Sequence, residues 1–186
     1  MDAMRIRVER YTYADYCTWD DGERRELIDG KVYAMSPAPS WEHQSILLEL
    51  AGQIREHLKG KRCKVFVAPF DVRLNAGAGD DTVVQPDIVV ICDRTKLGGT
   101  GCVGAPDMIV EVLSPSTALN DKVIKFNKYL QCGVREYWIV DPDSKIVSIH
   151  ILDNGRYYAT HYMDADIVPV HVLEGCLVNL SEVFEA

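Results

Sequence analysis

Two apolar runs of strand length lie at the centre of the chain and limit what it can fold into. One is Met108-Ile109-Val110-Glu111-Val112-Leu113, and the other is Ile88-Val89-Val90-Ile91, which follows Pro86-Asp87. Runs of this kind are typical of strands that are buried on both faces. Glu111 is the exception, because a carboxylate in a sheet core is costly unless a cation, a metal or hydrogen-bond donors compensate its charge.

The pattern around these runs predicts an α/β fold, in which a mixed β-sheet is flanked by helices and ends in antiparallel strands. A helix between two strands favours parallel pairing of those strands, as expected for the helix at 118–132 and the strand at 136–140. Thr12 is expected to cap a short first helix, and Asp29-Gly30 to close a hairpin. We predict further strands at 25–28, 31–35, 64–68, 70–74, 146–151 and 156–162, and a helix from Ser40 to about Gly60.

Composition indicates one domain spanning residues 1–186. The chain has 186 residues, 47% of them hydrophobic, which is enough for a sizeable core. No apolar stretch approaches the roughly 20 residues of a membrane helix, and the N-terminus lacks the apolar core of a secretory signal. We therefore expect a cytoplasmic protein without a membrane partner.

The six cysteines form no metal-binding pattern. They stand at positions 17, 63, 92, 102, 132 and 176, without a Cys-x-x-Cys pair. In a reducing compartment, thiols such as that of Cys92 behave as small hydrophobic groups. We expect neither a zinc site nor a catalytic cysteine.

Acidic and basic side chains follow the two central strands in an order that suggests phosphodiester chemistry. Asp87 begins one strand and Glu111 lies within the next, while Lys122 and Lys125 lie on the helix that follows. Two carboxylates on adjacent strands can hold a hard cation such as Mg2+, and a nearby ammonium can orient water or stabilise a phosphate. The net charge of −8 argues against a general nucleic-acid coating protein, but it does not exclude a nuclease.

An ordered series of short motifs covers nearly the whole chain. It comprises Glu26-Leu27-Ile28-Asp29-Gly30, Pro37, His43, Gln85-Pro86-Asp87, the run from Glu111 to Thr117, then Asp121, Lys125 and Tyr129 at steps of four, Gly133-Val134, and the run from Glu136 to Pro142. In these residues the chain resembles the PD-(D/E)XK phosphodiesterase superfamily, and within it the restriction endonuclease family called Uma-two.

The resemblance implies a restriction-endonuclease-like fold and Mg2+-dependent hydrolysis of DNA, with Mn2+ as a substitute and a free 3′ hydroxyl as product. It implies that Asp87 and Glu111 are catalytic metal ligands. The superfamily usually has Lys two residues after the Glu, where this chain has Leu113; in the family the matching lysine is on the next helix, at Lys125. A homodimer is the assembly that the resemblance suggests.

The choice between two lysines stays open on the sequence alone. A helical wheel at 100° per residue sets a core stripe of Leu119, Val123, Phe126 and Leu130. Lys122 borders this stripe more closely than Lys125 does. We favour Lys125 because of the resemblance and keep Lys122 as an accessory candidate.

Glu26 and His43 are the other accessory candidates. Glu26 could bind a second metal or a water, and His43 could contact phosphate or transfer a proton. In the simpler interpretation, Glu26 is an exposed strand residue and His43 is a polar residue in the first turn of a helix. The sequence does not favour either interpretation over the other. Basic residues also gather in two groups that could border one groove: Arg55, Lys59, Lys61, Arg62 and Lys64, and Lys122, Lys125 and Lys128.

Each main candidate has a structural alternative. Asp87 could simply be a polar residue beside a strand-initiating proline, and Lys125 a solvated partner of Asp121. Glu111 would need a buried salt bridge to a lysine of the following helix. These alternatives correspond to a catalytically silent domain that binds nucleic acid or protein, in which the catalytic candidates would lie apart or bind no metal.

Overall fold

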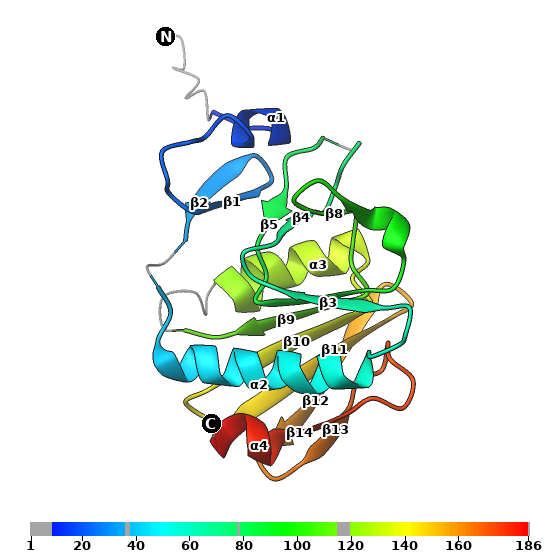
Figure 1. Ribbon diagram of the computed structural model, residues 1–186. Coiled ribbons are helices and arrows are strands. Elements are labelled where there is room, and N and C mark those ends of the chain that lie inside the picture. Colours follow the sequence, from blue (N-terminus) through cyan, green and yellow to red (C-terminus); the bar gives the residue numbers. More distant parts are fainter. Residues whose placement is uncertain (1–8, 36–37, 78, 115–119, 186) are drawn as a thin grey trace.

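The computed structural model describes residues 9–35, 38–77, 79–114 and 120–185. Figure 1 shows helices packed on both sides of a central sheet. Within these residues the helices are α1 (Tyr13–Tyr16), α2 (Trp41–His57), the 3-10 helix η1 (Arg94–Lys96), the π-helix η2 (Asn120–Lys125), α3 (Phe126–Cys132) and α4 (Leu180–Glu185).

The central sheet is mixed, as the sequence predicts. Its described strands run in the order β12 (Arg156–Met163), β11 (Ile146–Asp153), β10 (Glu136–Asp141), β9 (Met108–Val112), β6 (Ile88–Ile91) and β3 (Lys64–Val67). β9 pairs in parallel with β10, whereas the other neighbours are antiparallel. The expected parallel pairing across the intervening helix and the antiparallel C-terminal strands are therefore confirmed.

A second sheet carries the N-terminal hairpin. Its described strands run in the order β2 (Lys31–Ala34), β1 (Arg25–Ile28), β5 (Val83–Val84), β4 (Asp71–Arg73), β8 (Gly101–Val103) and β7 (Leu97–Gly98), and a separate pair is formed by β13 (Ile167–Pro169) and β14 (Leu177–Asn179). Asp29 and Gly30 close the β1–β2 hairpin with φ of 50° and 73°, the left-handed backbone that such a two-residue turn requires.

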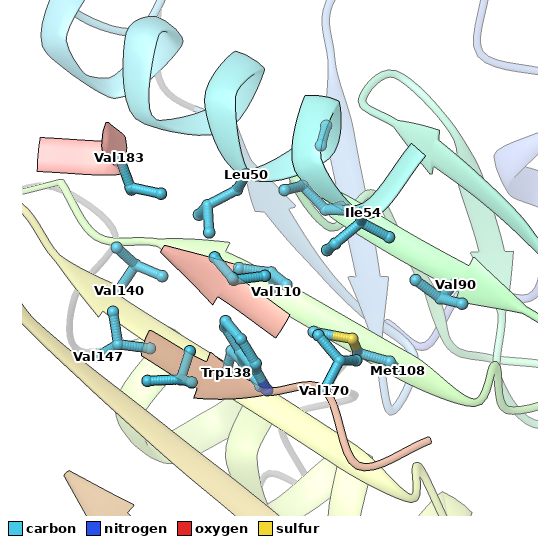
Figure 2. Packing of buried hydrophobic residues seen from close by; sticks show 14 of the residues in the cluster. Leu50, Ile54, Val90, Met108, Val110, Trp138, Val140, Val147, Val170 and Val183 are labelled. Carbon is cyan, nitrogen blue, oxygen red and sulfur yellow. The ribbon is translucent and has the colours of Figure 1, made fainter. Parts of the chain in front are cut away.

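One face of the central sheet packs against α2 and α4. Ser40 caps α2 by accepting a hydrogen bond from the His43 backbone N–H. The predicted apolar stripe of α2, which includes Leu50 and Ile54, is buried. Figure 2 shows these two side chains above Val110 and Trp138 of the sheet. Alternate residues of β6, β9 and β10 supply this face.

The other face of the sheet packs against α3 and the second sheet. Ile109, Tyr137 and Ile139 lie in this second core together with Tyr129 of α3. Because side chains alternate along a strand, Glu111 has the same orientation as Ile109 and is directed toward α3. The position of the carboxylate is thus fixed by the strand register.

The helix after β9 departs from the regular α-helix that the wheel assumes. Residues 120–125 form a π-helix, and only residues 126–132 are α-helical. Val123, expected in the core, is 48% exposed, whereas Lys125, Lys128 and Tyr129 are buried. The wider turn of a π-helix shifts the buried face, so the predicted stripe is wrong at Val123, whereas Phe126 packs against the second core. Leu119 lies outside the described residues.

Cys63 and Cys92 form a disulfide, contrary to the expectation of free thiols. The antiparallel register that pairs Lys64 with Ile91 brings the next two residues, Cys63 and Cys92, opposite each other. Nothing in the cysteine spacing predicts this pairing, because it depends on contacts between distant strands.

Across the described part of the chain, no helix is both long and apolar enough to traverse a membrane.

Candidate active site

Lys125 lies at the centre of a buried group of acidic side chains. Its Nζ is 2.9 Å from Glu26 Oε1, 3.0 Å from Glu111 Oε1 and 3.3 Å from Asp121 Oδ1. The Lys125 side chain is only 7% exposed, and its three partners are buried as well. Burial works to lower the pKa of Lys125, but the three carboxylates outweigh it and raise the pKa well above its ordinary value. Lys125 is therefore a charged ammonium.

Glu111 is held by two donors that bind the same carboxylate oxygen. Oε1 accepts from Lys125 and, at 2.8 Å, from the hydroxyl of Tyr129. Tyr129 is fully buried, and its ring packs edge-on against Tyr137 at 4.9 Å. Burial raises the pKa of Glu111, Lys125 opposes this effect, and the charges of Asp121, Asp87 and Glu26 add to it.

Asp87 is fixed by the chain around it and by His43. Asp87 Oδ2 accepts from the Val112 backbone N–H at 2.8 Å and lies 3.2 Å from His43 Nε2. Burial lowers the pKa of His43, but the hydrogen bond and the charge of Asp87 outweigh it, so the pKa is raised. The register that pairs Ile88 with Val110 brings Asp87 level with Glu111 on the adjacent strand.

Glu26 reaches the site from the second sheet. It lies on β1, and its Oε1 accepts from the Gln85 backbone N–H at 2.8 Å as well as from Lys125. The Gln85 side chain is fixed in turn, because its Oε1 accepts two hydrogen bonds from Arg24. Five segments of the chain therefore converge here: β1, α2, the start of β6, β9, and the η2–α3 helix.

We call Glu26, Asp87, Glu111 and Asp121 the carboxylate cluster. Among the residues that the structure describes, the basic groups paired with these four acidic ones are Lys125 and His43. Glu136, a buried carboxylate elsewhere in the chain, accepts its hydrogen bonds from neutral N–H groups. Glu136, which is fully buried, accepts from Trp138 Nε1 and from the backbone N–H groups of His171 and Val172.

The donor set suits a hard cation. Glu111 Oε1 and Asp87 Oδ2 each have two polar partners. The other oxygen of each carboxylate, Glu111 Oε2 and Asp87 Oδ1, accepts no hydrogen bond from the described residues. Oxygen ligands and surplus negative charge are what Mg2+ or Mn2+ requires. Within the described ranges, no group of three or more His, Cys, Asp or Glu side chains is arranged to hold a metal ion, and the Lys125 ammonium lies among the acidic groups. Mg2+ is commonly bound through only one or two carboxylates, so Asp87 and Glu111 fit this group.

One family model covers most of the chain. The family model described as "Uma2: Putative restriction endonuclease" matches residues 12–181. This chain belongs to the Uma2 family.

Two uncharacterized proteins of Synechocystis are similar to this Uma2 member. Protein slr1290 is 28% identical over 156 residues, which cover 82% of this chain and 80% of that protein. Protein sll1609 is 30% identical over 122 residues, which cover 64% of this chain and 67% of that protein.

A solved structure shares the fold. The crystal structure of a putative nuclease belonging to DUF820 from Anabaena variabilis matches with a TM-score of 0.76 and 21% identity, over 94% of this chain and 98% of that one. The mixed sheet flanked by helices is therefore the nuclease-like architecture that the sequence predicts for this Uma2 member.

Lys122, the accessory candidate, lies outside the group around Lys125. Its side chain is 51% exposed, and its Nζ is 3.8 Å from Asp141. The wheel favours Lys122 only because it treats the π-helical turn as α-helical. In this Uma2 chain the structure brings Asp87, Glu111, Lys125, Glu26 and His43 together and leaves Lys122 at the surface.

The structure bears differently on the structural alternatives to a catalytic role for Glu26, His43, Lys125 and Glu111. Glu26 is 6% exposed and His43 8% exposed, so neither is a solvated surface group. Lys125 does pair with Asp121, but in a buried setting. Glu111 has the buried salt bridge to a helix lysine that a purely structural role requires.

Two lysines of the second basic group are buried and paired with carboxylates. Lys125 is enclosed by the carboxylate cluster, and Lys128 is buried and paired with Asp29 of the β1–β2 turn. Lys59, in the other group, pairs with Glu56. Lys125 and Lys128 therefore supply no free cation to the groove that the sequence left open, and they are not the solvated helix residues of the simpler interpretation either.

Tyr129 and Asp121 also belong to the site, although the sequence does not predict a role for either. The sequence alone suggests Asp121 only as a solvated partner of Lys125 and gives Tyr129 no specific function. The spacing of Asp121, Lys125 and Tyr129 at steps of four was the available signal, since such residues share one side of a helix.

Proposed function

We propose that this protein is a metal-dependent endonuclease that hydrolyses DNA phosphodiester bonds. The observation that carries the proposal is the buried surplus of carboxylates around a single ammonium. A purely structural core avoids such a surplus, because an uncompensated buried charge is strongly destabilising. Costly charged groups of this kind are concentrated at functional sites.

In this proposal Asp87 and Glu111 bind Mg2+, for which Mn2+ can substitute. The metal would supply Lewis-acid activation of water and of the phosphate. His43 and the Val112 N–H hold one ligand, Asp87, in position. Tyr129 and Lys125 hold the other, Glu111. Fixed ligand orientation of this kind usually matters for metal affinity.

Lys125 is the proposed catalytic lysine. Its ammonium lies 3.0 Å from Glu111, so it is positioned beside any phosphate that reaches the metal ligands. There it would orient the attacking water or offset negative charge that develops on the phosphate oxygens. Glu26 and Asp121 keep Lys125 protonated and in place.

The proposal is tested by plasmid cleavage. Purified protein is incubated with supercoiled or single-stranded DNA at low salt, with Mg2+, Mn2+ or EDTA. We expect nicking with either metal, none with EDTA, and loss of nicking in Glu111→Gln and Asp87→Asn. Glu56→Gln removes an exposed carboxylate far along α2 and should cleave like the wild type. Metal-independent cleavage, or full activity of Glu111→Gln, would contradict the proposal.

A catalytically silent binding module is the second candidate. The buried pairing of Lys125 with Glu111 favours it, because the lysine already occupies the space among the acidic groups. This candidate predicts no cleavage by a well-folded wild type on any nucleic acid with either metal. A homodimer, which would allow both strands of a duplex to be cut, is also proposed and is tested by sedimentation equilibrium.

A further inference from the structure

Strand β12 is an exposed edge of the central sheet. It pairs with β11 on one side and with no other strand of the described chain on its other side. Edge strands are usually protected by a short length, a lysine, a proline or a bulge, because their free N–H and C=O groups can pair with another chain. The opposite edge, β3, has four residues and begins with Lys64. β12 has eight residues, contains neither lysine nor proline, and pairs with β11 without a bulge.

Every second residue of β12 directs its backbone groups to the free side. Asn154 and Gly155 form the two-residue turn between β11 and β12, with φ of 48° and 76°. Such a turn joins its two flanking residues by a hydrogen bond, so Arg156 bonds to β11. Because this bonding alternates along an antiparallel pair, the even-numbered residues of β12 bond to β11 and the odd-numbered residues point outward.

The end of β12 agrees with this alternation. The Met163 N–H donates to Asp166 Oδ2 at 2.8 Å, and the Met163 C=O accepts from the Asp166 N–H at 3.0 Å. The other outward groups are those of Tyr157, Ala159 and His161, and no described residue bonds to them. These backbone groups are therefore available to a further strand.

The direction of the side chains limits how a second copy of β12 can pair here. Tyr157 packs against the core on the α3 side of the sheet, and Tyr162 packs against the core on the α2 side. Two identical antiparallel strands are related by a two-fold axis perpendicular to the sheet, so each side is kept. Residues that lie opposite each other must therefore be both odd-numbered or both even-numbered.

One register meets these conditions with matching side chains. In it, Ala159 of each copy exchanges hydrogen bonds with His161 of the other, and Thr160 lies opposite itself on the axis. Tyr158, which is 58% exposed, then lies opposite Tyr162. Aromatic pairs and Thr–Thr pairs at opposed positions stabilise antiparallel strands.

The same register also pairs opposite charges. Arg156 begins β12, and Asp164 follows its last residue. Arg156 of each copy therefore lies opposite Asp164 of the other. Within the described part of the chain, neither residue has an ion-pair partner of its own. The contact is thus complementary in charge at both of its ends.

The neighbouring registers are less complementary. A shift of two residues in one direction gains backbone hydrogen bonds at Tyr157, but it places Arg156 opposite Tyr162 and leaves the charges unpaired. A shift in the other direction pairs Ala159 with Met163, whose backbone groups are already bonded within the chain.

We propose that two copies of this chain pair antiparallel through β12, with Arg156 of each copy opposite Asp164 of the other, and join their central sheets into one. Addition of a strand to a free sheet edge is a common mode of association. This pairing specifies the contact of the homodimer, and it rests on the proposed function only for the use that two sites in one complex have.

In this dimer the two candidate active sites lie on the same face of the joined sheet. Thr160, on the axis, is in register with Val110 of β9 through the pairs of the intervening strands. Glu111 is therefore one residue from the line through the axis. Seven strand spacings separate the two copies of β9, which corresponds to about 34 Å. This separation is close to one turn of double-helical DNA.

Sedimentation equilibrium of the full chain tests the contact without any substrate. We expect the wild type to form dimers. Ala159→Pro removes an outward N–H and no hydrogen bond to β11, so a folded monomer is expected, with circular dichroism as the check on folding. Arg156→Glu and Asp164→Arg should each weaken the dimer by about 10- to 100-fold.

The double variant Arg156→Glu/Asp164→Arg tests the register. The two positions are about 26 Å apart along the extended chain, so they cannot compensate each other within one copy. The double variant should regain the wild-type dissociation constant to within about 3-fold. Lys59, just beyond α2, is 64% exposed, so Lys59→Glu makes the same charge change as Arg156→Glu elsewhere and should alter dimerisation by no more than about 2-fold.

Three results would overturn the inference: a wild type that stays monomeric at its highest soluble concentration, a dimer that persists in folded Ala159→Pro, or a double variant that associates no better than Arg156→Glu. Plasmid cleavage with Mg2+ is measured in parallel. A β12-dependent dimer that does not cleave supports the inference and contradicts the nuclease proposal. A monomer that cleaves does the reverse.

Discussion

Lys125 is the residue on which the charge balance of the site depends. It is the shared cation of three buried carboxylates, Glu26, Glu111 and Asp121. Lys125→Met would leave these groups without their cation, and we expect a loss of about 3–5 kcal/mol in the free energy of unfolding. Urea denaturation measures this loss. Lys122→Met, which alters an exposed lysine three residues earlier, should change stability by no more than about 0.5 kcal/mol.

His43 gives the metal-free protein a pH-dependent stability. Asp87 raises the pKa of His43 in the folded state above its value in the unfolded chain. The protonated pair therefore stabilises the fold fully below about pH 6.5, and this contribution is lost as the pH rises through the folded pKa.

We expect the difference in unfolding free energy between wild type and His43→Gln to be largest at the acidic side of this window and to shrink above it. Denaturation series at several pH values in EDTA measure the difference. A difference that grows with rising pH would show that the histidine is buried in its neutral form.

Helix α2 stabilises the site by covering one face of the central sheet. Ile54 is fully buried and lies over this face in Figure 2, so Ile54→Ala should cost about 2–5 kcal/mol. Leu48→Ala on the exposed side of the same helix should stay within about 0.5 kcal/mol. Thermal or urea unfolding of the two variants compares them directly, and equal losses would contradict the described orientation of α2.

The elements with a strong apolar period were predictable from the sequence. The α2 stripe, the central strands and the β1–β2 hairpin all follow from spacing and turn residues, and the structure has them within a few positions. Glu111 was recognisable as a site candidate because it interrupts an apolar run. These patterns depend on residues close together in the sequence, so they can be recognised without knowing the tertiary fold.

The η2–α3 helix was not predictable in the same way. The π-helical segment places Val123 at the surface and Lys125 in the interior. The buried partners of Lys125 include Glu26, which is distant in the sequence. Glu26 lies on β1 of the second sheet, far from Lys125 in the sequence. The family resemblance identified Lys125, whereas periodicity favoured Lys122.

At the scale of the whole molecule, the site lies where two sheets and two helices meet. β1 from the second sheet supplies Glu26, and the central sheet supplies Glu111. Lys128 and Asp29 connect α3 to the β1–β2 turn, which keeps Glu26 within reach of Lys125. The single domain expected over residues 1–186 remains a prediction.

The Cys63–Cys92 disulfide closes a loop between residues 29 positions apart. A crosslink over a loop of this size stabilises a protein by about 2–4 kcal/mol through its effect on the unfolded chain. We expect dithiothreitol to lower the unfolding free energy of the wild type by this amount and to leave Cys63→Ser unchanged. If reduction has no effect on the wild type, the disulfide is absent in solution.

The central claim is that the carboxylate cluster binds a divalent cation, and calorimetric titration with Mn2+ tests it most directly. We expect the folded wild type to bind Mn2+ and Mg2+ to compete for the same site. Binding should be lost in Asp87→Asn and Glu111→Gln but kept in Glu56→Gln. If a well-folded wild type shows no binding heat, or if Glu111→Gln binds as tightly as the wild type, the carboxylate cluster is a structural ion-pair network and not a metal centre.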